Sequence, residues 1–323
     1  MAGKRLLWLG RLELGWRVIF LLGPTAAGKS RLAMEVAEQT GAEIVSVDAF
    51  QIYRGLDIGT GKPAKEEQNK VRHHLIDLVD PEENFTAADY LREAGKVLQD
   101  AGNRNVPSIW VGGTGLYHRV LTEGLSRAPG TDTEVAAELD KMTTNELVEE
   151  IRRVDLVWSE KADLKNRRRL IRALAVWRQT GKKLSDWQEK ETVHGPMAEV
   201  GVWVLLPDLE VLTGVIRERV KTMWQKGWVE EVRGLMKRPG WEECPGSRAI
   251  GYAEVVDLLA GRITEGEACD KIVVATRAYA KRQLTWFRGI PKVRGIEIDP
   301  REPLPKTGVE MLVRALGERN FLG

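Results

Sequence analysis

Short apolar runs alternate with amphipathic stretches along the first part of the chain, and turn residues separate them. Runs of this length predict strands that are buried on both faces, and the stretches between them predict helices. The predicted strands are 16–22, 43–47, 75–79 and 107–111, and the predicted helices are 28–40 and 86–101. This alternation is typical of an α/β fold, in which helices cover both faces of a parallel sheet.

The pattern changes near Arg127, where helical periodicity replaces the alternation and continues to about residue 196 without a convincing strand. An apolar run at 202–206 then resumes the strand pattern. We therefore predict an all-helical domain inserted into an α/β core, with the insertion at 127–199 and the core at 16–126 and 200–323. The later predicted elements are helices at 209–237, 248–259 and 264–287 and an edge strand at 295–299.

One segment matches the phosphate-binding pattern G-x-x-x-x-G-K-[ST] and follows the apolar run at 18–22. Its glycines let backbone N–H groups turn toward a di- or triphosphate, and the helix that begins there directs its positive end at the same anion. Lys29 supplies a charge for the terminal phosphate, and Ser30 is placed to bind Mg²⁺. The residues expected at the phosphate are Gly23, Pro24, Thr25, Ala26, Ala27, Gly28, Lys29 and Ser30. The motif predicts a phosphate site without specifying a reaction.

Composition narrows the class of protein. The 323 residues, 43% hydrophobic and 30% charged, suit a soluble globular protein of one large or two modest domains. Two isolated cysteines and four scattered histidines predict neither a disulfide framework nor a metal cluster, and favour a reducing cytosol. No run approaches the roughly 20 apolar residues of a membrane span. Charged residues interrupt the apolar start of the chain, so we do not expect a cleaved leader.

The net charge of +2 is unevenly distributed. Residues 160–183 contain nine lysines and arginines against two acids, and residues 270–294 contain seven against one. Two basic islands predict a polyanionic partner larger than the ligand of the phosphate loop. A solvated face is the alternative interpretation of each cluster.

Asp48 ends the predicted strand at 43–47. The strand that ends at Val111 is followed by glycines and a threonine, whereas nucleotide hydrolases have a Mg²⁺-binding aspartate there. A carboxylate beside a phosphate site can act as a general base on an acceptor nucleophile. Asp48 can also cap the turn that follows it, and the two roles are compatible.

Six blocks resemble the motifs of the tRNA dimethylallyltransferases, the isopentenyl-diphosphate transferase family. They are DAFQIYRGLDIGTGKP (48–63), FTAADY (85–90), VGGTGLY (111–117), RRRLIRAL (167–174), SRAIGY (247–252) and AKRQLTWFRG (280–289), in the family's order. The resemblance implies a P-loop NTPase-like core, an inserted tRNA-binding domain and a Mg²⁺ cofactor. It also implies transfer of a dimethylallyl group from its diphosphate to the exocyclic amine of the adenosine 3′ of a tRNA anticodon.

The same resemblance implies roles for residues of this chain. Asp48, Lys29 and Thr114 are expected in catalysis, and Arg219 is expected at the diphosphate. Val215 stands where the family commonly has a further arginine, which leaves open whether Arg217 or Arg219 makes the second contact to the diphosphate. The residues expected to contact the tRNA anticodon stem-loop are Asp48, Ala49, Phe50, Gln51, Thr114, Ala136, Arg167, Arg168, Arg169, Arg172, Arg248, Ala249, Ile250, Gly251, Tyr252, Ala253, Lys281 and Arg282.

Two other activities stay open at this point. A small-molecule or nucleoside kinase has the same kind of phosphate loop, but it needs neither the basic insertion nor the SRAIGY block. An adenylate isopentenyltransferase acts on free nucleotides, and the long basic insertion favours tRNA instead. The expected partners are therefore tRNA and dimethylallyl diphosphate, with the chain acting as a monomer in the cytoplasm and away from membranes.

Overall fold

The computed structural model describes residues 17–317, which form two compact units. One unit combines the chain up to Thr122 with the chain from Met197, and the other spans Glu123–Pro196. The predicted insertion, 127–199, is therefore displaced by a few residues at both ends. Trp16, the predicted first residue of the first strand, lies outside the described residues. Within residues 17–317, no helix is both long and apolar enough to cross a membrane.

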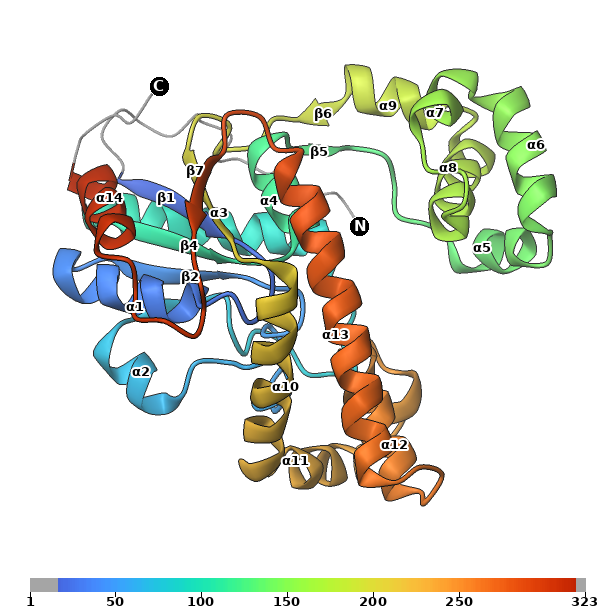
Figure 1. Ribbon diagram of the computed structural model, residues 1–323. Coiled ribbons are helices and arrows are strands. Elements are labelled where there is room, and N and C mark those ends of the chain that lie inside the picture. The colour runs from blue at the N-terminus through green and yellow to red at the C-terminus, as the bar shows by residue number, and fades with distance from the viewer. Residues whose placement is uncertain (1–16, 318–323) are drawn as a thin grey trace. The chain divides into compact units, whose positions relative to one another are not determined.

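Six parallel strands form the sheet of the first unit, in the order β3-β2-β4-β1-β7-β8 (Figure 1). Their bounds are β1 (Val18–Leu22), β2 (Glu43–Val47), β3 (His73–His74), β4 (Ser108–Gly112), β7 (Gly201–Leu206) and β8 (Arg294–Glu297). Every residue of β2 and β4 is buried, as expected for central strands covered on both faces. After the insertion the chain returns to the middle of the sheet, because β7 pairs with β1.

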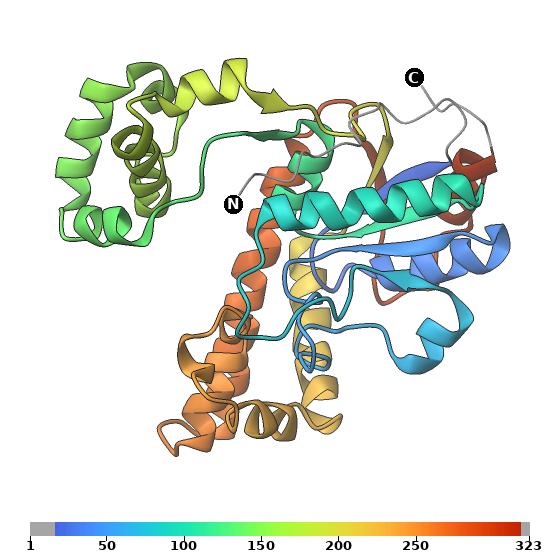
Figure 2. The same ribbon diagram turned by 180° about the vertical axis from the view of Figure 1, so that it is seen from behind.

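Helices cover both faces of this sheet (Figures 1 and 2). On one face, α1 (Lys29–Thr40) and α14 (Lys306–Gly317) pack in a buried cluster with alternate strand residues such as Ile19 and Leu21. On the other face lie α3 (Ala87–Asn103) and α4 (Gly115–Thr122). Thr86 caps α3 through a capping box. The short helix α2 (Lys65–Lys70) precedes the edge strand β3.

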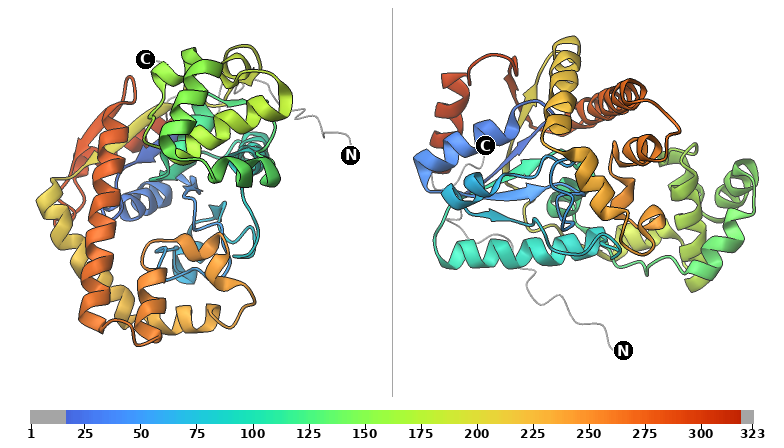
Figure 3. Two further views of the ribbon diagram at one scale, coloured as in Figure 1. Left: turned by 90° about the vertical axis from the view of Figure 1, so that its right-hand side faces the viewer. Right: turned by 90° about the horizontal axis from the view of Figure 1, so that it is seen from below.

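Four further helices extend beyond the sheet and enclose the segment that follows β2 (Figure 3). They are α10 (Leu209–Gln225), α11 (Trp228–Leu235), α12 (Tyr252–Leu259) and α13 (Glu265–Arg288). Ile52, Tyr53 and Leu56 are buried in one cluster with Trp228 and Tyr252 of these helices. The carboxyl ends of the central strands therefore face a space that these helices help to close.

The predicted strand at 75–79 is wrong. Pairing with β2 ends after His74, because the backbone takes positive φ values at Leu75 (58°) and Asp77 (53°). The N–H of Asp77 then donates to the carbonyl of Gln51 at 3.1 Å, so the segment packs as a loop against the chain after β2.

The predicted single helix at 209–237 is also wrong, because Gly227 breaks it at a φ of 94°. The predicted helix at 248–259 begins only at Tyr252, since Gly251 has a φ of 96°. Both glycines adopt the left-handed conformation that ends or precedes a helix at little cost. These two turns bring α11 and α12 together.

The second unit contains α5 (Thr133–Asp140), α6 (Thr144–Val154), α7 (Leu156–Lys161), α8 (Arg167–Thr180) and α9 (Leu184–Lys190). Leu147 and Ile151 of α6 are fully buried with Leu170 and Leu174 of α8. A two-residue antiparallel ladder joins its ends, β5 (Leu125–Ser126) with β6 (Thr192–Val193). The expectation of no strand within this region is wrong there, because two residues are too few to leave a periodic pattern.

Candidate active site

The phosphate loop joins β1 to α1 at the carboxyl end of its strand. Positive φ values at Ala26 (64°) and Gly28 (87°) turn the loop into the helix. The first intrahelical hydrogen bond runs from the N–H of Leu32 to the carbonyl of Gly28 at 3.1 Å. Within the described chain, this helix start has neither a side-chain cap nor an acidic residue in its first turn. Its leading N–H groups are therefore open to an anion.

Lys29 and Arg219 place two cations at this loop. The Lys29 Nζ atom donates to the carbonyl of Pro24 at 2.7 Å. Burial and the nearby charge of Arg219 lower the pKa of Lys29 to about 7, while the charge of Asp48 raises it. Burial likewise lowers the pKa of Arg219, again opposed by Asp48. Two desolvated cations form a site that an anionic ligand stabilises.

Gln283 of α13 ties the phosphate loop to the end of β4. Its Oε1 accepts the N–H of Thr25 at 2.9 Å, and its Nε2 donates to the carbonyl of Gly113 at 2.9 Å. A Cβ atom at Gly113 would lie 2.0 Å from that Nε2, so the contact requires glycine. Gln283 lies in the block at 280–289, but its role is not predictable from the sequence, because nothing in the helix pattern distinguishes it from other buried positions.

Asp48 occupies the turn directly after β2. Its Oδ1 accepts the N–H groups of Phe50 at 2.8 Å and Gln51 at 3.3 Å, so the carboxylate caps the turn. Its Oδ2 makes no hydrogen bond to any other residue of the described chain and stays available to a ligand. The Thr114 Oγ1 accepts the N–H of Ala49 at 3.1 Å, which fastens the end of β4 to the same turn.

The side chain of Gln51 is held from two sides. Its Oε1 accepts the Ser46 hydroxyl at 2.8 Å, and its Nε2 faces the carbonyls of Thr60 (3.4 Å) and Gly61 (3.2 Å). Carbonyl oxygens only accept hydrogen bonds, so the amide nitrogen must lie on their side. The orientation of the amide is therefore determined by the loop that contains Thr60 and Gly61.

A single cavity of about 920 Å³ is lined by residues of the phosphate loop and by Gln283, Asp48 and Gln51, whereas Thr114 lies outside its wall. Its volume lies toward the upper end of the roughly 300–1,000 Å³ of typical ligand sites. Lys29, Arg219 and Asp48 all line it, so the phosphate loop and the carboxylate open into one space. Val215 adds an apolar part to its wall. Other lining residues are Thr25, Ala26, Ala27, Gly28, Ser30, Ser46, Phe50, Gln51, Ile216, Val220, Ala249, Ile250, Thr276, Tyr279 and Arg282.

Tyr279 is a cavity residue that the sequence analysis missed. Burial and the negative charge of Asp48 raise the pKa of Tyr279 to about 12, against smaller opposing contributions from Thr114, Arg282 and Gln283. The hydroxyl therefore stays protonated at neutral pH and can donate a hydrogen bond. A tyrosine on the inner side of a long helix has the same periodicity as any core aromatic, so sequence alone does not identify it.

Arg217, the alternative to Arg219, lies outside the cavity wall and pairs with Asp270 of α13 at 3.0 Å. Of the residues expected to contact tRNA in the block at 248–253, Arg248 and Ala253 are exposed, and Ala249 and Ile250 line the cavity. Lys281 and Arg282 are exposed as well. The Tyr252 side chain is completely buried beside buried Gly251.

The insertion carries the remaining predicted residues. Arg168 and Arg169 are exposed on α8, and neither pairs with an acid within the described chain. Arg167 instead donates to Asp140 through its Nε at 3.1 Å and its Nη2 at 2.7 Å. Arg172 donates to the carbonyls of Ala128 and Pro129, and Ala136 lies partly buried on α5.

Ser30 is the protein group that fits a Mg²⁺ ion. Its hydroxyl lines the cavity and makes no hydrogen bond to another described residue. Among residues 17–317, no three His, Cys, Asp or Glu side chains gather as a metal site. The histidine pair serves packing, since His74 Nε2 lies 2.7 Å from a Glu43 oxygen and His73 Nδ1 lies 2.8 Å from the Val71 carbonyl. Mg²⁺ commonly binds with few protein ligands plus phosphate oxygens and water, which matches this donor set.

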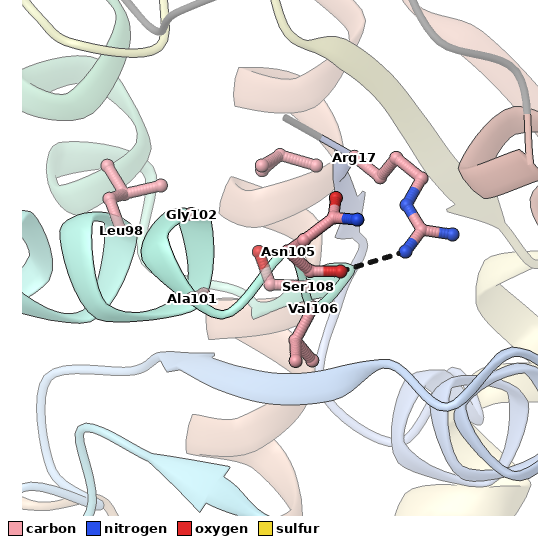
Figure 4. A pocket seen from close by; sticks show the side chains of 8 residues that line it. Arg17, Leu98, Ala101, Gly102, Asn105, Val106 and Ser108 are labelled. Atoms are coloured by element: carbon pink, nitrogen blue, oxygen red, sulfur yellow. Dashed lines mark hydrogen bonds between the residues drawn. The ribbon is translucent and has the colours of Figure 1, made fainter. Parts of the chain in front are cut away.

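A second cavity lies at the opposite, amino-terminal ends of β1 and β4 (Figure 4). Its volume is about 10 Å³, which is about the space of one water molecule. Arg17 donates to the carbonyl of Asn105 at 2.9 Å across it. It is too small for an organic ligand, so the large cavity is the candidate active site.

Comparisons with known proteins show the family to which the chain belongs. Residues 51–290 match the family model described as IPP transferase. The chain is 41% identical over 285 residues to the tRNA dimethylallyltransferase of Geobacter sulfurreducens, covering 87% of this chain and 92% of that protein. It is also 41% identical over 275 residues to the enzyme of the same name from Myxococcus xanthus, covering 84% and 89%.

Two solved structures are similar as well. The tRNA isopentenylpyrophosphate transferase of Bacillus halodurans has a TM-score of 0.68 and 31% identity, covering 94% of this chain and 97% of that one. A eukaryotic dimethylallyltransferase acting on tRNA has a TM-score of 0.74 over 87% of this chain and 74% of its own. Its 22% identity supports the shared fold alone. From the match over most of its length and its similarity to these relatives, we conclude that the chain belongs to the IPP transferase family.

Proposed function

We propose that the chain transfers a dimethylallyl group from dimethylallyl diphosphate to the exocyclic amine of the adenosine 3′ of a tRNA anticodon, with release of diphosphate. The observation that carries this proposal is the single cavity lined by Lys29 and Arg219 together with Asp48. An anion site and a carboxylate in one space suit a reaction in which a diphosphate leaves and an amine loses a proton. The relatives' names, tRNA dimethylallyltransferase, support the same reaction.

The donor half of the reaction uses the phosphate loop. As the bond between the allylic carbon and the diphosphate oxygen breaks, negative charge accumulates on the leaving group. Lys29, Arg219 and the N–H groups at the start of α1 stabilise that charge, and they do so more strongly in a partly dehydrated cavity than in water. Ser30 would hold a Mg²⁺ ion, which neutralises further diphosphate charge when bound. Apolar Val215 and Val220 offer a wall for the hydrocarbon.

The acceptor half uses the turn after β2. The exocyclic nitrogen of adenine is a weak nucleophile, because its lone pair is delocalised into the ring. As the new carbon–nitrogen bond forms, Asp48 accepts a proton from this nitrogen through its unpaired Oδ2. Gln51 contacts the edge of the base, which must leave its stack to enter the cavity. The exposed arginines of α8 contact the RNA backbone.

The two rival activities explain fewer of the observed features of the chain. A kinase would use the phosphate loop, but the relatives that match most of this chain carry a tRNA-modifying transferase name. An adenylate isopentenyltransferase would leave the basic surface of α8 without a purpose. We accordingly propose tRNA as the acceptor, dimethylallyl diphosphate as the donor, and a monomer in the cytosol as the working form.

One assay tests the proposal against both rivals. The purified chain is incubated with Mg²⁺, dimethylallyl diphosphate and either unmodified tRNA or AMP, and the digested nucleosides are identified by mass. We expect a dimethylallyl adduct on adenosine from tRNA only. A parallel incubation with ATP and no prenyl donor measures ADP release. ADP formation without tRNA prenylation would support a kinase, and an adduct on AMP alone would support the adenylate transferase.

A further inference from the structure

The carboxylate of Glu231, on α11, accepts four hydrogen bonds. Its Oε2 accepts the N–H groups of Asp57 at 2.9 Å and Ile58 at 2.6 Å. Its Oε1 accepts the N–H of Gly59 at 3.2 Å and the hydroxyl of Tyr252 at 2.8 Å. Three of the donors are consecutive backbone groups of one loop, so a single side chain determines where that loop lies. Hydrogen bonds to an ionised acceptor are about twice as strong as neutral ones.

The loop at 56–62 is enclosed on its other sides as well. The Trp228 ring packs so closely that a Cβ atom at Gly59 would lie 2.2 Å from its Nε1. Lys62, whose side chain is 3% exposed, donates to Asp57 and Asp77 at 2.6 Å each. The loop therefore has one defined position, and Glu231 accepts the hydrogen bonds of its backbone N–H groups.

The same loop orients the residue proposed to meet the adenine. The carbonyls of Thr60 and Gly61 face the Nε2 of Gln51, which leaves its Oε1 on the side of Ser46. Both Ser46 and Gln51 line the cavity, whereas Glu231 lies outside its wall. Hydrogen bonds and the backbone of residues 57–61 thus link Glu231 to the Gln51 amide, and within the loop the N–H of Gly61 donates to the carbonyl of Ile58 at 3.0 Å.

We infer that Glu231 is a positioning residue of the reaction, which acts through the loop at 56–62 to orient the Gln51 amide toward the adenine. This inference rests on the proposed function, because it takes Gln51 as the contact to the base. Glu231 does not touch the substrate. It sets which atom of the Gln51 amide the cavity presents, and it should therefore affect the use of tRNA more than the use of dimethylallyl diphosphate.

The test uses Glu231→Gln, which keeps the size of the side chain but replaces one acceptor oxygen by an NH₂ group that faces N–H donors. Its matched control is Glu230→Gln on the same helix, since Glu230 is 72% exposed and, among residues 17–317, pairs with Arg233 alone at 3.2 Å. We expect Glu231→Gln to lower kcat/KM for tRNA and the affinity for an unmodified anticodon stem-loop by about tenfold. The KM for dimethylallyl diphosphate and all properties of Glu230→Gln should change by less than about twofold.

A double-mutant cycle with Gln51→Ala separates positioning from a general loss of stability. If Glu231 acts through Gln51, adding Glu231→Gln to Gln51→Ala changes stem-loop affinity by less than about twofold. If the two substitutions reduced stem-loop affinity independently, so that their effects multiplied, the inference would be overturned. The same holds if Glu231→Gln has the stem-loop affinity and the kinetics of the wild type.

Hydrogen exchange provides a readout that needs no turnover. The amides of Asp57, Ile58 and Gly59 should exchange faster in Glu231→Gln than in the wild type or in Glu230→Gln. Unchanged exchange at all three amides would overturn the inference. If the wild-type chain bound the stem-loop but formed no adduct, the proposed function would be refuted. The role of Glu231 would still be decided by the exchange measurement and the affinity cycle, since neither requires turnover.

Discussion

The charged residues that we propose to bind or position ligands lie in opposite environments in the α/β body and in the helical insertion. In the body, Lys29 lines a cavity where burial and Arg219 lower its pKa to about 7, and Glu231 is covered by four donors. In the insertion, Arg168 and Arg169 are exposed and hydrated on α8. A charge removed from water costs free energy unless a partner or a ligand compensates it, whereas a hydrated charge costs little.

This difference predicts how substitutions in each unit should affect the reaction and the binding of RNA. A buried charge in the body has a defined geometry, so one substitution should remove one chemical step or one interaction with a ligand. A hydrated charge in the insertion has many alternative positions, and its attraction for RNA falls with salt. Effects in the body should therefore be large and specific, and effects in the insertion small, additive and dependent on ionic strength.

The largest effect should come from Asp48→Asn. The amide oxygen can still accept the N–H groups of Phe50 and Gln51, so the turn persists, but the base is absent. We expect kcat to fall by about 10²–10⁴-fold while tRNA affinity survives. Quench-flow measurement of product and a filter-binding titration check both. Asp208→Asn is the control, because Asp208 caps α10 in the same manner with hydrogen bonds of 2.8 and 3.0 Å. A near-normal turnover of Asp48→Asn would refute Asp48 as the base.

The next largest effect concerns Lys29 and pH. Bound diphosphate favours the charged amine, so ligand binding should raise the Lys29 pKa from about 7 and take up a proton above that pH. The affinity for diphosphate should then fall by up to about tenfold per pH unit above 7, because Lys29 must take up a proton when the ligand binds. In Lys29→Arg the side chain stays charged, so its diphosphate affinity should lack this pH dependence. Since the diphosphate itself titrates equally with both proteins, the difference between the two pH profiles reports Lys29 alone. Calorimetry from pH 6 to 9 is the measurement, and identical pH profiles would contradict the assignment.

Most of the α/β order could be predicted because the central parallel strands are short and mostly apolar. The bounds of β2 match the prediction, and β7 differs by one residue. The prediction of a strand at 75–79 was wrong because its apolar residues pack as a loop. The positive φ values of Leu75 and Asp77 cannot be recognised in the pattern of hydrophobic residues. The break at Gly227 was predictable, since a glycine after Lys226 is a common helix end.

The site was predictable where motifs carry the chemistry, and less so elsewhere. The phosphate loop and Asp48 could be identified from their patterns and from the family resemblance. Glu231 and Tyr279 could not, because an acid on a short helix and an aromatic on a long one are ordinary in sequence. Their roles arise from interactions between segments far apart in the chain, such as the hydrogen bonds of Glu231 to residues 57–59.

Gly61→Ala should produce a smaller but selective effect. Gly61 has a φ of 62°, and an added Cβ would lie 1.9 Å from Arg219 Nη2, so the guanidinium must move. We expect diphosphate affinity to fall by about tenfold, as for removal of one charged hydrogen bond. Gly41→Ala is the control, because its φ is 68° and nothing lies within 4 Å of the added atom. Both variants should lose about 1 kcal/mol of stability from backbone strain. Equal calorimetric affinities of the two variants would show that Arg219 does not depend on this space.

The smallest effect on catalysis should come from the insertion, and its signature is salt dependence. Removing the charges of Arg168 and Arg169 together should lower tRNA affinity a few-fold and reduce the slope of log affinity against log salt by about 0.7–0.9 for each phosphate that is no longer neutralised. Adding Arg167→Gln should change the slope little further, because Arg167 is held by Asp140. Arg178→Gln is the control, since Arg178 pairs with Glu150 at 3.0 Å. Fluorescence anisotropy across a series of salt concentrations measures the slope, with kcat at saturating tRNA expected to stay unchanged. An unaltered slope for the Arg168 and Arg169 variant would mean that these side chains are solvated surface, and the insertion would then bind RNA through other residues.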